Sequence, residues 1–330
     1  MSNTKVLITG GAGFIGSTLA RKLKILGYEV TIFDNFSPQV HGENALDSAE
    51  YRILSEEFEV VTEDVRNTSA LEKYLVHKDI VVHLAAETGT GQSMYKVSHY
   101  TDVNISATAH LMEILSKKQG SVRKLVIASS RSIYGEGKYK CSKHGVVYPE
   151  SRTEANMLRR EYVPTCPYCE QFVEDLATSE DAKIQPISVY GLTKFAQENI
   201  ALTVGRAIGL PTIAFRFQNV YGPGQSLSNP YTGILSIFST RAQAHKKIEI
   251  FEDGSESRDF VYIDDVVDAI VLGMETKRVD FGAYNVGTGV KSTVLDIARG
   301  ICKNFQSESQ IEVTHKFRLG DIRTNYSDNT

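Results

Sequence analysis

The sequence predicts an α/β fold: a doubly wound parallel sheet with a smaller C-terminal lobe and an insertion that contains cysteine and histidine. First, short apolar runs rich in β-branched residues alternate with longer amphipathic stretches, as in parallel sheets whose strands are buried on both faces. Second, a glycine-rich turn joins the first of these runs to the first amphipathic stretch. Third, the polar segment 136–186 interrupts the alternation and holds three of the four cysteines, so we expect it to project from the sheet.

The expected elements follow one another in the order of such a fold. Strands are predicted over residues 5–9, 29–34, 58–64, 80–85, 124–129, 211–220 and 284–286, where the apolar runs are too short for helices. Helices are predicted over residues 14–26, 104–117, 188–208 and 264–276, where apolar residues recur with a helical period. Repetition of strand, helix and strand is the pattern of a doubly wound parallel sheet.

The composition indicates an ordinary globular protein and narrows its surroundings. The 330 residues are 42% apolar and 23% charged, with a formal net charge of −4, so a basic face that binds nucleic acid is not expected. No apolar run approaches the roughly 20 residues that span a bilayer, and the N-terminal residues lack the features of a signal peptide. We therefore expect a cytoplasmic protein with no nucleic-acid or membrane partner, whose four cysteines do not form structural disulfides.

A phosphate-binding turn is predicted where the first strand meets the first helix. Gly10, Gly13 and Gly16 form the pattern GxxGxxG, a variant of the dinucleotide fingerprint. Glycine allows the tight turn and the close approach of a pyrophosphate, while the helix N-terminus offers free N–H groups and the positive end of its dipole. This context favours a Rossmann dinucleotide site over a glycine turn in a flavodoxin-like fold that binds no nucleotide.

The acid that ends the second strand indicates which dinucleotide binds. The Asp34 carboxylate can accept hydrogen bonds from the adenosine ribose and would repel a 2′-phosphate, and no Lys or Arg follows in residues 35–38, so NAD is favoured over NADP. Asp64, after the third strand, would lie near the adenine or would instead cap a helix. The expected cofactor contacts are Gly10, Gly13, Phe14, Ile15, Gly16, Asp34, Asn35, Asp64, Val65, Leu84, Ala85, Ala86, Tyr190 and Lys194.

A catalytic pair is predicted at the start of the helix over residues 188–208. Tyr190 and Lys194 are four residues apart, which places both side chains on one face. An ammonium beside a phenol favours the charged form, so Lys194 should lower the pKa of Tyr190 and make it a general base, and a positively charged nicotinamide ring would act in the same direction. Ser129 and Ser130 end the fifth strand, where a hydroxyl can bond the same substrate oxygen. Without that context, the pair would be an ordinary surface pair.

The chain resembles an extended short-chain dehydrogenase/reductase of the NAD-dependent nucleotide-sugar epimerase/dehydratase family. The resemblance rests on the motifs TGGAGFIGS, HLAAETG, ASSRSIYG, SVYGLTK, FRFQNVYGPG, RDFVYIDDV and YNVGTG, and it extends over nearly the whole chain. It implies a role in carbohydrate biosynthesis and a homodimer formed through helices 104–117 and 188–208. It also implies a catalytic set of Ser130, Tyr190 and Lys194, and a nucleotide diphosphate site of Asn219, Arg258, Arg318 and Asp321.

The pattern of elements and this resemblance together divide the chain into three parts. Residues 1–135 and 186–222 are expected to form the NAD-binding Rossmann domain, and residues 136–185 the insertion. Residues 223–330 are expected to form mainly a substrate-binding lobe, from which residues 255–275 return to the Rossmann domain.

The residues after the fifth strand bear on the type of reaction. The 4,6-dehydratases of the family carry an Asp-Glu pair there, whereas this chain has Arg131 and Ser132, which disfavours dehydration and leaves decarboxylation open. A 4-epimerase needs only Tyr190 to remove the proton of the sugar 4-hydroxyl, with hydride passing to NAD and back to the opposite face of a transient 4-keto sugar. The alternatives are a net NAD(P)-dependent nucleotide-sugar oxidoreductase and a non-catalytic NAD-binding protein.

The substrate expected is a nucleotide-diphosphate sugar. The segment 85–95 and the interrupted motif before the insertion resemble the dTDP-L-rhamnose 4-epimerase branch, which interconverts dTDP-L-rhamnose and dTDP-6-deoxy-L-talose. A UDP-hexose 4-epimerase, acting on UDP-glucose or UDP-GlcNAc, is the alternative. The residues expected to contact the substrate are Glu87, Thr90, Gln92, Ser93, Ser130, Arg131, Asn219, Arg258, Arg318 and Asp321.

The insertion contains two short-spaced pairs of metal-ligand residues. Cys141 and His144 form C-x2-H, and Cys166 and Cys169 form C-x2-C, a spacing that matches a structural zinc knuckle. Four protein ligands would leave no open position, so the zinc would serve to fold a segment too polar to fold alone. Free thiols in a loop and a redox-active CxxC are the alternatives. Cys302 and His83 lie in apolar patterns and are expected to be packed in the core.

Overall fold

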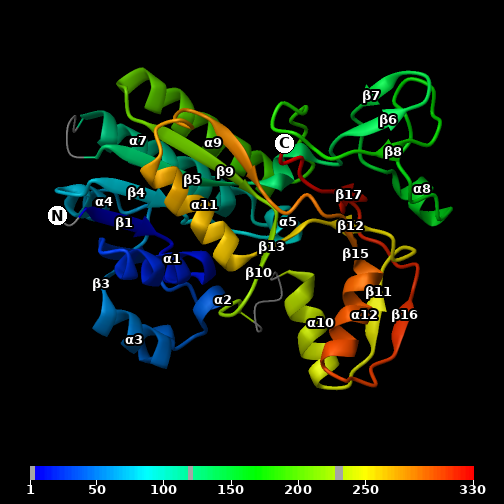
Figure 1. The fold of residues 1–330 in the computed structure, drawn as a ribbon, viewed down its shortest axis with the longest axis horizontal. Helices are drawn as coiled ribbons and strands as arrows, with labels where there is room; N and C mark the ends of the chain where they lie inside the picture. The colour runs from blue at the N-terminus through cyan, green and yellow to red at the C-terminus, as the bar shows by residue number, and fades with distance from the viewer. Residues whose placement is uncertain (1–3, 118–121, 227–232) are drawn as a thin grey trace.

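The computed structural model describes residues 4–117, 122–226 and 233–330, and its centre is a seven-stranded parallel sheet (Figure 1). The strand order is β14-β9-β5-β4-β1-β2-β3, and the order reverses between β1 and β4, which opens a crevice at the carboxyl ends of these two strands. The strands are β1 (Lys5–Thr9), β2 (Glu29–Asp34), β3 (Glu59–Thr62), β4 (Ile80–His83), β5 (Lys124–Ser130), β9 (Thr212–Phe217) and β14 (Ala283–Val286). The predicted doubly wound sheet is confirmed.

Helices cover both faces of this sheet and bury two separate apolar layers. On one face, α1 (Phe14–Ile25) and α11 (Ile263–Glu275) pack over Val6 and Ile8 of β1. On the other face, α4 (Thr68–Leu75), α7 (Ala107–Lys117) and α9 (Val189–Ile208) pack over Leu7 and its neighbours. The inner strands β1, β4, β5 and β9 are therefore buried on both sides, which explains why their sequences are mostly apolar rather than alternating. Short helices α2 (Pro38–His41), η1 (Ala45–Asp47), α3 (Ala49–Glu57) and α5 (Thr90–Ser93) fill the connections.

Two predicted elements differ from the observed ones. The helix expected over 104–117 begins earlier, because α6 (Val97–Tyr100) and the π-helical turn η2 (Thr101–Ser106) lead directly into α7. The strand expected over 211–220 is divided, because the N–H of Asn219 leaves the central sheet and donates to the carbonyl of Asp259. The second part, β10 (Asn219–Tyr221), pairs instead with β13 (Phe260–Tyr262). The strand β14 also lies in the central sheet, outside the ranges that the sequence assigned to the Rossmann domain.

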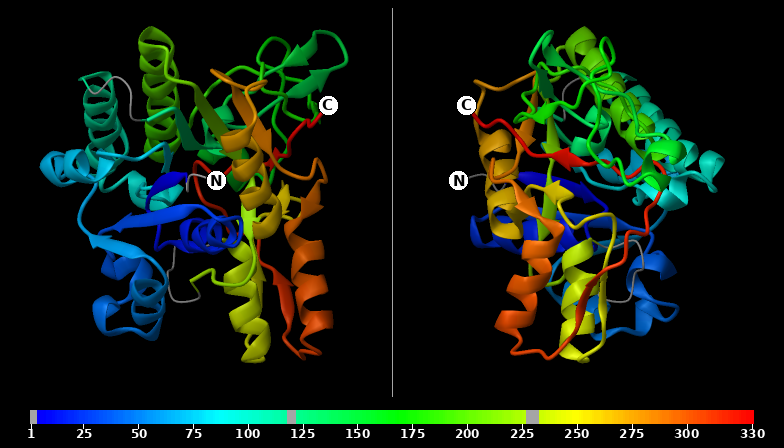
Figure 2. Two further views of the ribbon diagram at one scale, coloured as in Figure 1. Left: turned by 60° about the vertical axis from the view of Figure 1, so that its left-hand side comes forward. Right: turned by 90° about the vertical axis from the view of Figure 1, so that its right-hand side faces the viewer.

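The insertion and the C-terminal lobe are built from short elements. The insertion contains β6 (Tyr139–Cys141), β7 (Gly145–Val147), α8 (Glu154–Leu158) and β8 (Glu174–Asp175), and it follows the turn η3 (Arg131–Tyr134). The lobe contains α10 (Ile234–Gln243), β11 (Ile248–Ile250), α12 (Val294–Asn304) and β16 (Ile311–Val313). A small sheet of β15 (Ser292–Thr293), β12 (Ser257–Arg258) and β17 (Thr324–Asn325) lies between them (Figure 1). In both views of Figure 2, α10 and α12 lie at the end of the molecule opposite the insertion.

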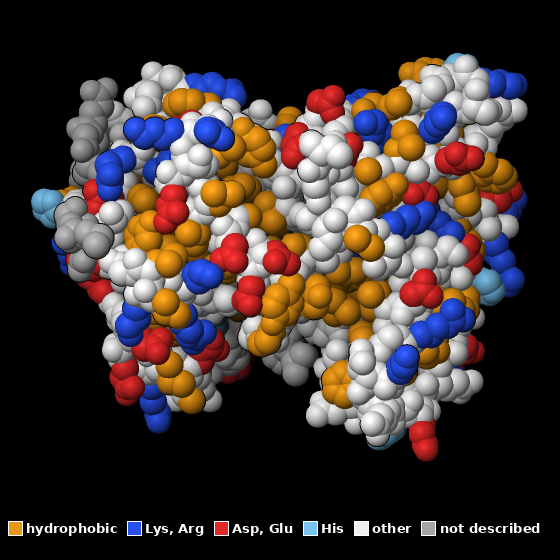
Figure 3. All heavy atoms as spheres, in the orientation of Figure 1, with side chains coloured by type: hydrophobic (Ala, Val, Ile, Leu, Met, Phe, Trp, Pro, Cys, Tyr) orange, Lys and Arg blue, Asp and Glu red, His pale blue; other side chains and the backbone are white. Residues whose placement is uncertain are grey.

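The surface carries charges of both signs. Lys and Arg side chains are intermingled with Asp and Glu side chains over the face drawn in Figure 3. Among the helices in the described part of the chain, none has the length and apolar composition needed to cross a bilayer.

Candidate active site

A cavity of about 570 Å³ opens at the carboxyl ends of β1, β2, β4 and β5. Its walls include the glycine turn after β1, the last residue of β2, the loop after β4 and the first turns of α9. All residues that the sequence predicted as cofactor contacts line it, namely Gly10, Gly13, Phe14, Ile15, Gly16, Asp34, Asn35, Asp64, Val65, Leu84, Ala85, Ala86, Tyr190 and Lys194. The structure thus brings together segments that are far apart in the sequence.

The glycine turn is shaped to accept an anion. A Cβ on Gly16 would lie 2.3 Å from the carbonyl oxygen of Gly10, so the helix and the turn approach one another more closely than any side chain allows. Helix α1 begins after Gly13, and no side chain caps its first N–H groups. These groups remain available to a ligand, and the helix dipole favours a negative one. This arrangement fits the pyrophosphate of a dinucleotide.

Two carboxylates line the cavity, and one of them contacts the glycine turn. Asp34 accepts hydrogen bonds from the N–H groups of Ala12 (3.0 Å) and Phe36 (2.9 Å), and burial raises its pKa while these hydrogen bonds oppose the rise. Asp64 accepts two hydrogen bonds from the Arg66 guanidinium at 2.8 Å, which lower its pKa to about 2. Asn67 caps α4, so the alternative role of Asp64 as a helix cap is not observed.

The predicted catalytic residues meet at the inner end of the cavity. Ser130 is the last residue of β5, and Tyr190 and Lys194 lie one turn apart at the start of α9. Ser130 hydrogen-bonds the Tyr190 phenol and accepts a hydrogen bond from the hydroxyl of Ser132 at 2.9 Å. The position of the helix start is fixed by the Ser93 hydroxyl, which accepts from the N–H of Tyr190 at 3.0 Å.

The electrostatics of this group differ from the sequence prediction. Burial raises the pKa of Tyr190, and the hydrogen bond with Ser130 and the charge of Arg131 oppose that rise. Burial also lowers the pKa of Lys194 to about 7. The expectation that Lys194 lowers the pKa of the phenol is therefore wrong for the protein without ligand, because the buried ammonium is itself destabilised. Arg131 is the cation that acts on Tyr190 here.

A buried polar network that the sequence did not reveal lies beneath Lys194. The ammonium of Lys194 donates to Gln197, whose amide donates to the hydroxyl of Thr108 at 2.9 Å. The His83 ring lies between Thr108 (3.0 Å) and Thr9 (2.7 Å) and is fully buried, as its apolar context predicted, and burial lowers its pKa to about 3. The spacing of Gln197, three residues after Lys194, is a signal that points toward it.

A second, smaller cavity of about 50 Å³ lies beside the catalytic residues. It brings together Thr90, Arg131, Ser132, Gly135, Ile187, Ser188, Arg258, Gly320, Asp321 and Ile322. Arg131 donates to the side chain of Asn219 at 2.7 Å, which links a fifth predicted substrate residue to this group. Burial lowers the pKa of Arg131 to about 9, with the nearby charge of Arg258 acting in the same direction. Two neighbouring guanidinium groups on one cavity favour an anionic ligand such as a diphosphate.

Three of the predicted substrate residues have other contacts in this structure. Gln92 exchanges two hydrogen bonds with Gln39, at 3.1 and 2.8 Å, and lines neither cavity. Ser93 is buried against the start of α9, and the exposed Arg318 lies 5.0 Å from the centre of the Phe251 ring. Glu87 does line the larger cavity, where its carboxylate lies 3.1 Å from the His99 ring.

The four predicted metal ligands gather at one point of the insertion. Cys141 and His144 lie on the β6–β7 hairpin, and Cys166 and Cys169 lie on a second turn. The sulfur of Cys141 is 3.7 Å from that of Cys169, and the His144 Nδ1 is 3.6 and 3.5 Å from the sulfurs of Cys141 and Cys166. A tetrahedral zinc with ordinary bond lengths sets such ligand atoms roughly 3.5–3.8 Å apart, so these four residues fit the ion.

Similar proteins with curated functions cover almost the whole chain. The sequence pattern of the NAD dependent epimerase/dehydratase family matches residues 6–171 and 165–287. The dTDP-L-rhamnose 4-epimerase of Burkholderia thailandensis is 37% identical over 325 residues, which cover 97% of this chain and 86% of that protein. The UDP-glucose 4-epimerase of Mycolicibacterium smegmatis is 32% identical over 328 residues, which cover 99% of this chain and 90% of that protein.

Solved structures show the same fold. The UDP-glucuronic acid 4-epimerase from Bacillus cereus, in complex with UDP-glucuronic acid and NAD, has a TM-score of 0.79 and 27% identity, covering 98% of this chain and 90% of that one. The UDP-glucose 4-epimerase from Thermotoga maritima, with UDP-glucose, has a TM-score of 0.77 and 28% identity, covering 99% and 90%. The similarity includes the central sheet and the C-terminal lobe.

Proposed function

We propose a specific reaction for this chain, which belongs to the NAD dependent epimerase/dehydratase family: it is an NAD-dependent nucleotide-sugar 4-epimerase. The observation that carries the proposal is the meeting of Ser130, Tyr190 and Lys194 on the same cavity as the glycine turn. The smaller cavity with Arg131 and Arg258 adjoins them and supplies the cations for a nucleotide diphosphate. A sugar held between the two cavities would present its hydroxyl to Tyr190.

The roles of the chain's own groups follow from their positions. The uncapped N–H groups after Gly13 would hold the NAD pyrophosphate, and the Asp34 carboxylate would accept from the adenosine ribose. When bound, NAD would supply a reversible acceptor for the hydride of the sugar. Tyr190 would remove the proton of the 4-hydroxyl and later give it back, while Ser130 holds the same oxygen. Lys194, with a pKa of about 7, can exchange a proton near neutral pH.

The two residues that follow β5 favour epimerisation over dehydration. Arg131 and Ser132 occupy the positions where dehydratases of the family carry Asp and Glu, and neither is suited to eliminate water. Epimerisation asks for no second acid or base, and the cofactor emerges unchanged. A net oxidoreductase would consume added NAD(P), whereas an epimerase turns over with the cofactor it already holds.

The substrate we favour is dTDP-L-rhamnose, interconverted with dTDP-6-deoxy-L-talose. The similarity to the Burkholderia enzyme supports it, and the similarity to UDP-glucose 4-epimerases supports a UDP-hexose as the second candidate. Incubation with a panel of dTDP- and UDP-sugars, read by NMR, would separate them: conversion of UDP-sugars alone would contradict the first choice.

A structural zinc ion bound by Cys141, His144, Cys166 and Cys169 is part of the proposal. The distances among their ligand atoms support it, and so does the small apolar core of the insertion, which consists of Tyr139, Cys141, Val147, Cys166 and Val173. So few apolar side chains give little stability without a further crosslink. The metal would order the insertion and take no part in the reaction.

The assembly and location are proposed as well. A homodimer through α7 and α9 would cover Leu192, a large apolar side chain of α9 that is 54% exposed. Light scattering of the purified protein tests this, and a monomer at micromolar concentration would contradict it. Cell fractionation tests the cytoplasmic location.

The Tyr190→Phe variant tests the reaction. It removes only the phenolic oxygen, so we expect turnover to fall by about 1,000-fold or more while NAD stays bound. Bound NAD is measured after denaturation, and turnover by NMR. Tyr168→Phe, at a 73% exposed position of the insertion, is the matched control and should leave turnover unchanged. Full activity of Tyr190→Phe would refute the mechanism.

A further inference from the structure

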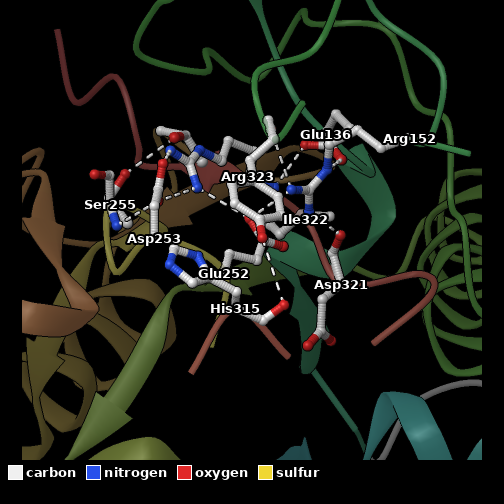
Figure 4. Close-up of polar contacts among 12 residues, drawn as sticks. Glu136, Arg152, Glu252, Asp253, Ser255, His315, Asp321, Ile322 and Arg323 are labelled. Carbon is white, nitrogen blue, oxygen red and sulfur yellow. Dashed lines mark hydrogen bonds and ion pairs between the residues drawn. The ribbon is translucent and has the colours of Figure 1, made fainter. Parts of the chain in front are cut away.

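A cluster of buried charges lies where the insertion meets the end of the chain (Figure 4). Glu136 begins the insertion, Arg152 lies within it, Glu252 follows β11, and Arg323 precedes β17. The two glutamates are 2% and 1% exposed, and the side chains of the two arginines are 4% and 8% exposed. None of these side chains lines either cavity, so the proposed reaction leaves the cluster without a role.

Arg152 joins three parts of the chain through one guanidinium group. Its Nη1 donates to the Glu252 carboxylate at 2.7 Å and to the carbonyl oxygen of Tyr162 at 3.1 Å. Its Nη2 donates to the carbonyl oxygen of Asp321 at 2.6 Å, and its Nε lies 3.4 Å from the carboxylate of Glu136. A planar fork of donors can hold several acceptors in fixed directions, which a single ammonium cannot do.

The carbonyl that Arg152 binds belongs to a wall of the smaller cavity. Asp321 and Ile322 line that cavity together with Arg131 and Arg258. The carbonyl of Ile322 is bound by Arg258 at 2.9 Å, and the N–H of Arg323 is bound by the Glu136 carboxylate at 2.8 Å. Side chains from the insertion and from β12 therefore hold the backbone of three successive residues.

The same segment is held further by the Arg323 guanidinium, which donates to Glu252 at 2.9 Å and to Asp253 at 2.8 and 2.9 Å, and by the N–H of Ser257, which donates to the carbonyl of Arg323 at 3.0 Å. The only regular structure that the segment enters in the described part of the chain is the two-residue strand β17, paired with the equally short β12. A strand of that length contributes few backbone hydrogen bonds, so the side chains that hold residues 321–323 decide where the wall lies.

We propose that Arg152 is a positioning residue for the nucleotide-sugar substrate, through which the insertion sets the substrate-side wall of the active site. Arg152 touches no reacting atom; it acts by holding the carbonyl of Asp321. The expected change in KM rests on the proposed function. The effect of Arg152 on the position of residues 321–323 can be measured without any turnover. The insertion is then a working part of substrate binding and not an appendage of the sheet.

The Arg152→Lys variant tests the proposal on the intact protein. It keeps the positive charge beside Glu136 and Glu252 but loses the fork, so the wall should loosen while the cluster stays neutralised. We expect KM for the nucleotide sugar to rise about tenfold with kcat within about twofold, because ground-state positioning is lost while the catalytic groups are intact. Hydrogen exchange of residues 320–325 should accelerate, and bound NAD should be unchanged. Arg159→Lys is the matched control, since its ion pair with Glu161 is on the surface of the same insertion.

A second, charge-balanced variant tests the proposal if Arg152→Lys does not fold. Arg152→Gln combined with Glu136→Gln removes the fork and one partner together, so no new buried charge is left unpaired. It should show the same rise in KM and the same faster exchange. Unchanged KM and unchanged exchange in either folded variant would overturn the proposal. Faster exchange in a protein that epimerises no sugar would instead reject the proposed function and leave the positioning role standing.

Discussion

Different forces stabilise the two halves of the molecule. One half forms the larger cavity, and the other forms a wall of the smaller cavity. The first is a seven-stranded sheet between two extended apolar layers, and its ligand cradle is one continuous turn from Gly10 to Gly16. The second consists of two- and three-residue strands, an ionic cluster around Arg152 and a group of four potential metal ligands. Apolar burial responds little to pH or chelators, whereas buried charges respond to pH and metal-ligated thiolates respond to both pH and chelators. The two halves should therefore lose their structure under different conditions.

The largest effect is expected from a side chain at the glycine turn. In Gly16→Val, the Cβ would lie 2.3 Å from the Gly10 oxygen and 2.6 Å from the Cα of Gly11, so the turn must open. We expect bound NAD to fall below detection and turnover to fall by about 100-fold or more. In Gly300→Ala, in α12, the added methyl group meets no atom within 4 Å, and stability should rise by about 0.5–1 kcal/mol. Retention of NAD by Gly16→Val would show that this turn does not hold the dinucleotide.

Metal removal should act on the other half alone. Purified protein should contain about one zinc per chain, and Cys166→Ser or a strong chelator should remove it, because loss of one thiolate breaks the tetrahedron. Hydrogen exchange should then accelerate across the insertion and the smaller cavity, with KM rising about tenfold and bound NAD unchanged. Cys302→Ala, in the lobe core, should keep its zinc. An ordered insertion in protein that contains no metal would contradict the assignment.

Opposite pH dependences of the two halves are the smallest of the three effects. Burial lowers the pKa of His83 to about 3, so the stability of the sheet should fall as the pH decreases from about 6.5 toward 3, since the unfolded chain binds the proton first. Burial raises the pKa of Glu256, before β12, to about 7, so the stability of the small sheet should fall as the pH increases from about 4.5 to 7. Each effect should amount to about 1–3 kcal/mol.

Local hydrogen exchange measured at several pH values would give the change of stability with pH separately for the central sheet and for the small sheet. The His83→Gln variant should abolish the first and Glu256→Gln the second. Parallel slopes in both regions would mean that the halves unfold together as one cooperative unit.

The comparison also explains what the sequence could predict. The strands, the helices of the sheet and the cofactor cavity follow from local patterns, because GxxGxxG, the acid that ends β2 and the YxxxK pair each lie within one or two elements. The C-x2-H and C-x2-C pairs were informative for the same reason. By contrast, Gln92 and Arg318 were assigned by resemblance to the substrate, and in the structure they contact Gln39 and Phe251 instead.

The groups that sequence reasoning missed are those that depend on distant partners. Arg152 binds the carbonyl of Asp321, and Glu198, buried at α9, receives hydrogen bonds from Ser129 and Arg216. No short spacing marks such pairs, and a buried carboxylate looks like a surface residue until its partner is located. The pKa of Tyr190 was misjudged for a related reason: desolvation depends on packing that no motif records.

The bond between Glu136 and the N–H of Arg323 joins residues 187 positions apart. On a ribosome, the first six strands of the sheet and the dinucleotide cradle have been synthesised well before Arg323 is added. The nascent protein can thus acquire its cofactor early, whereas its substrate-binding wall is completed only when the last part of the chain emerges and docks. Premature termination before that point would yield a polypeptide that sequesters dinucleotide without recognising a sugar.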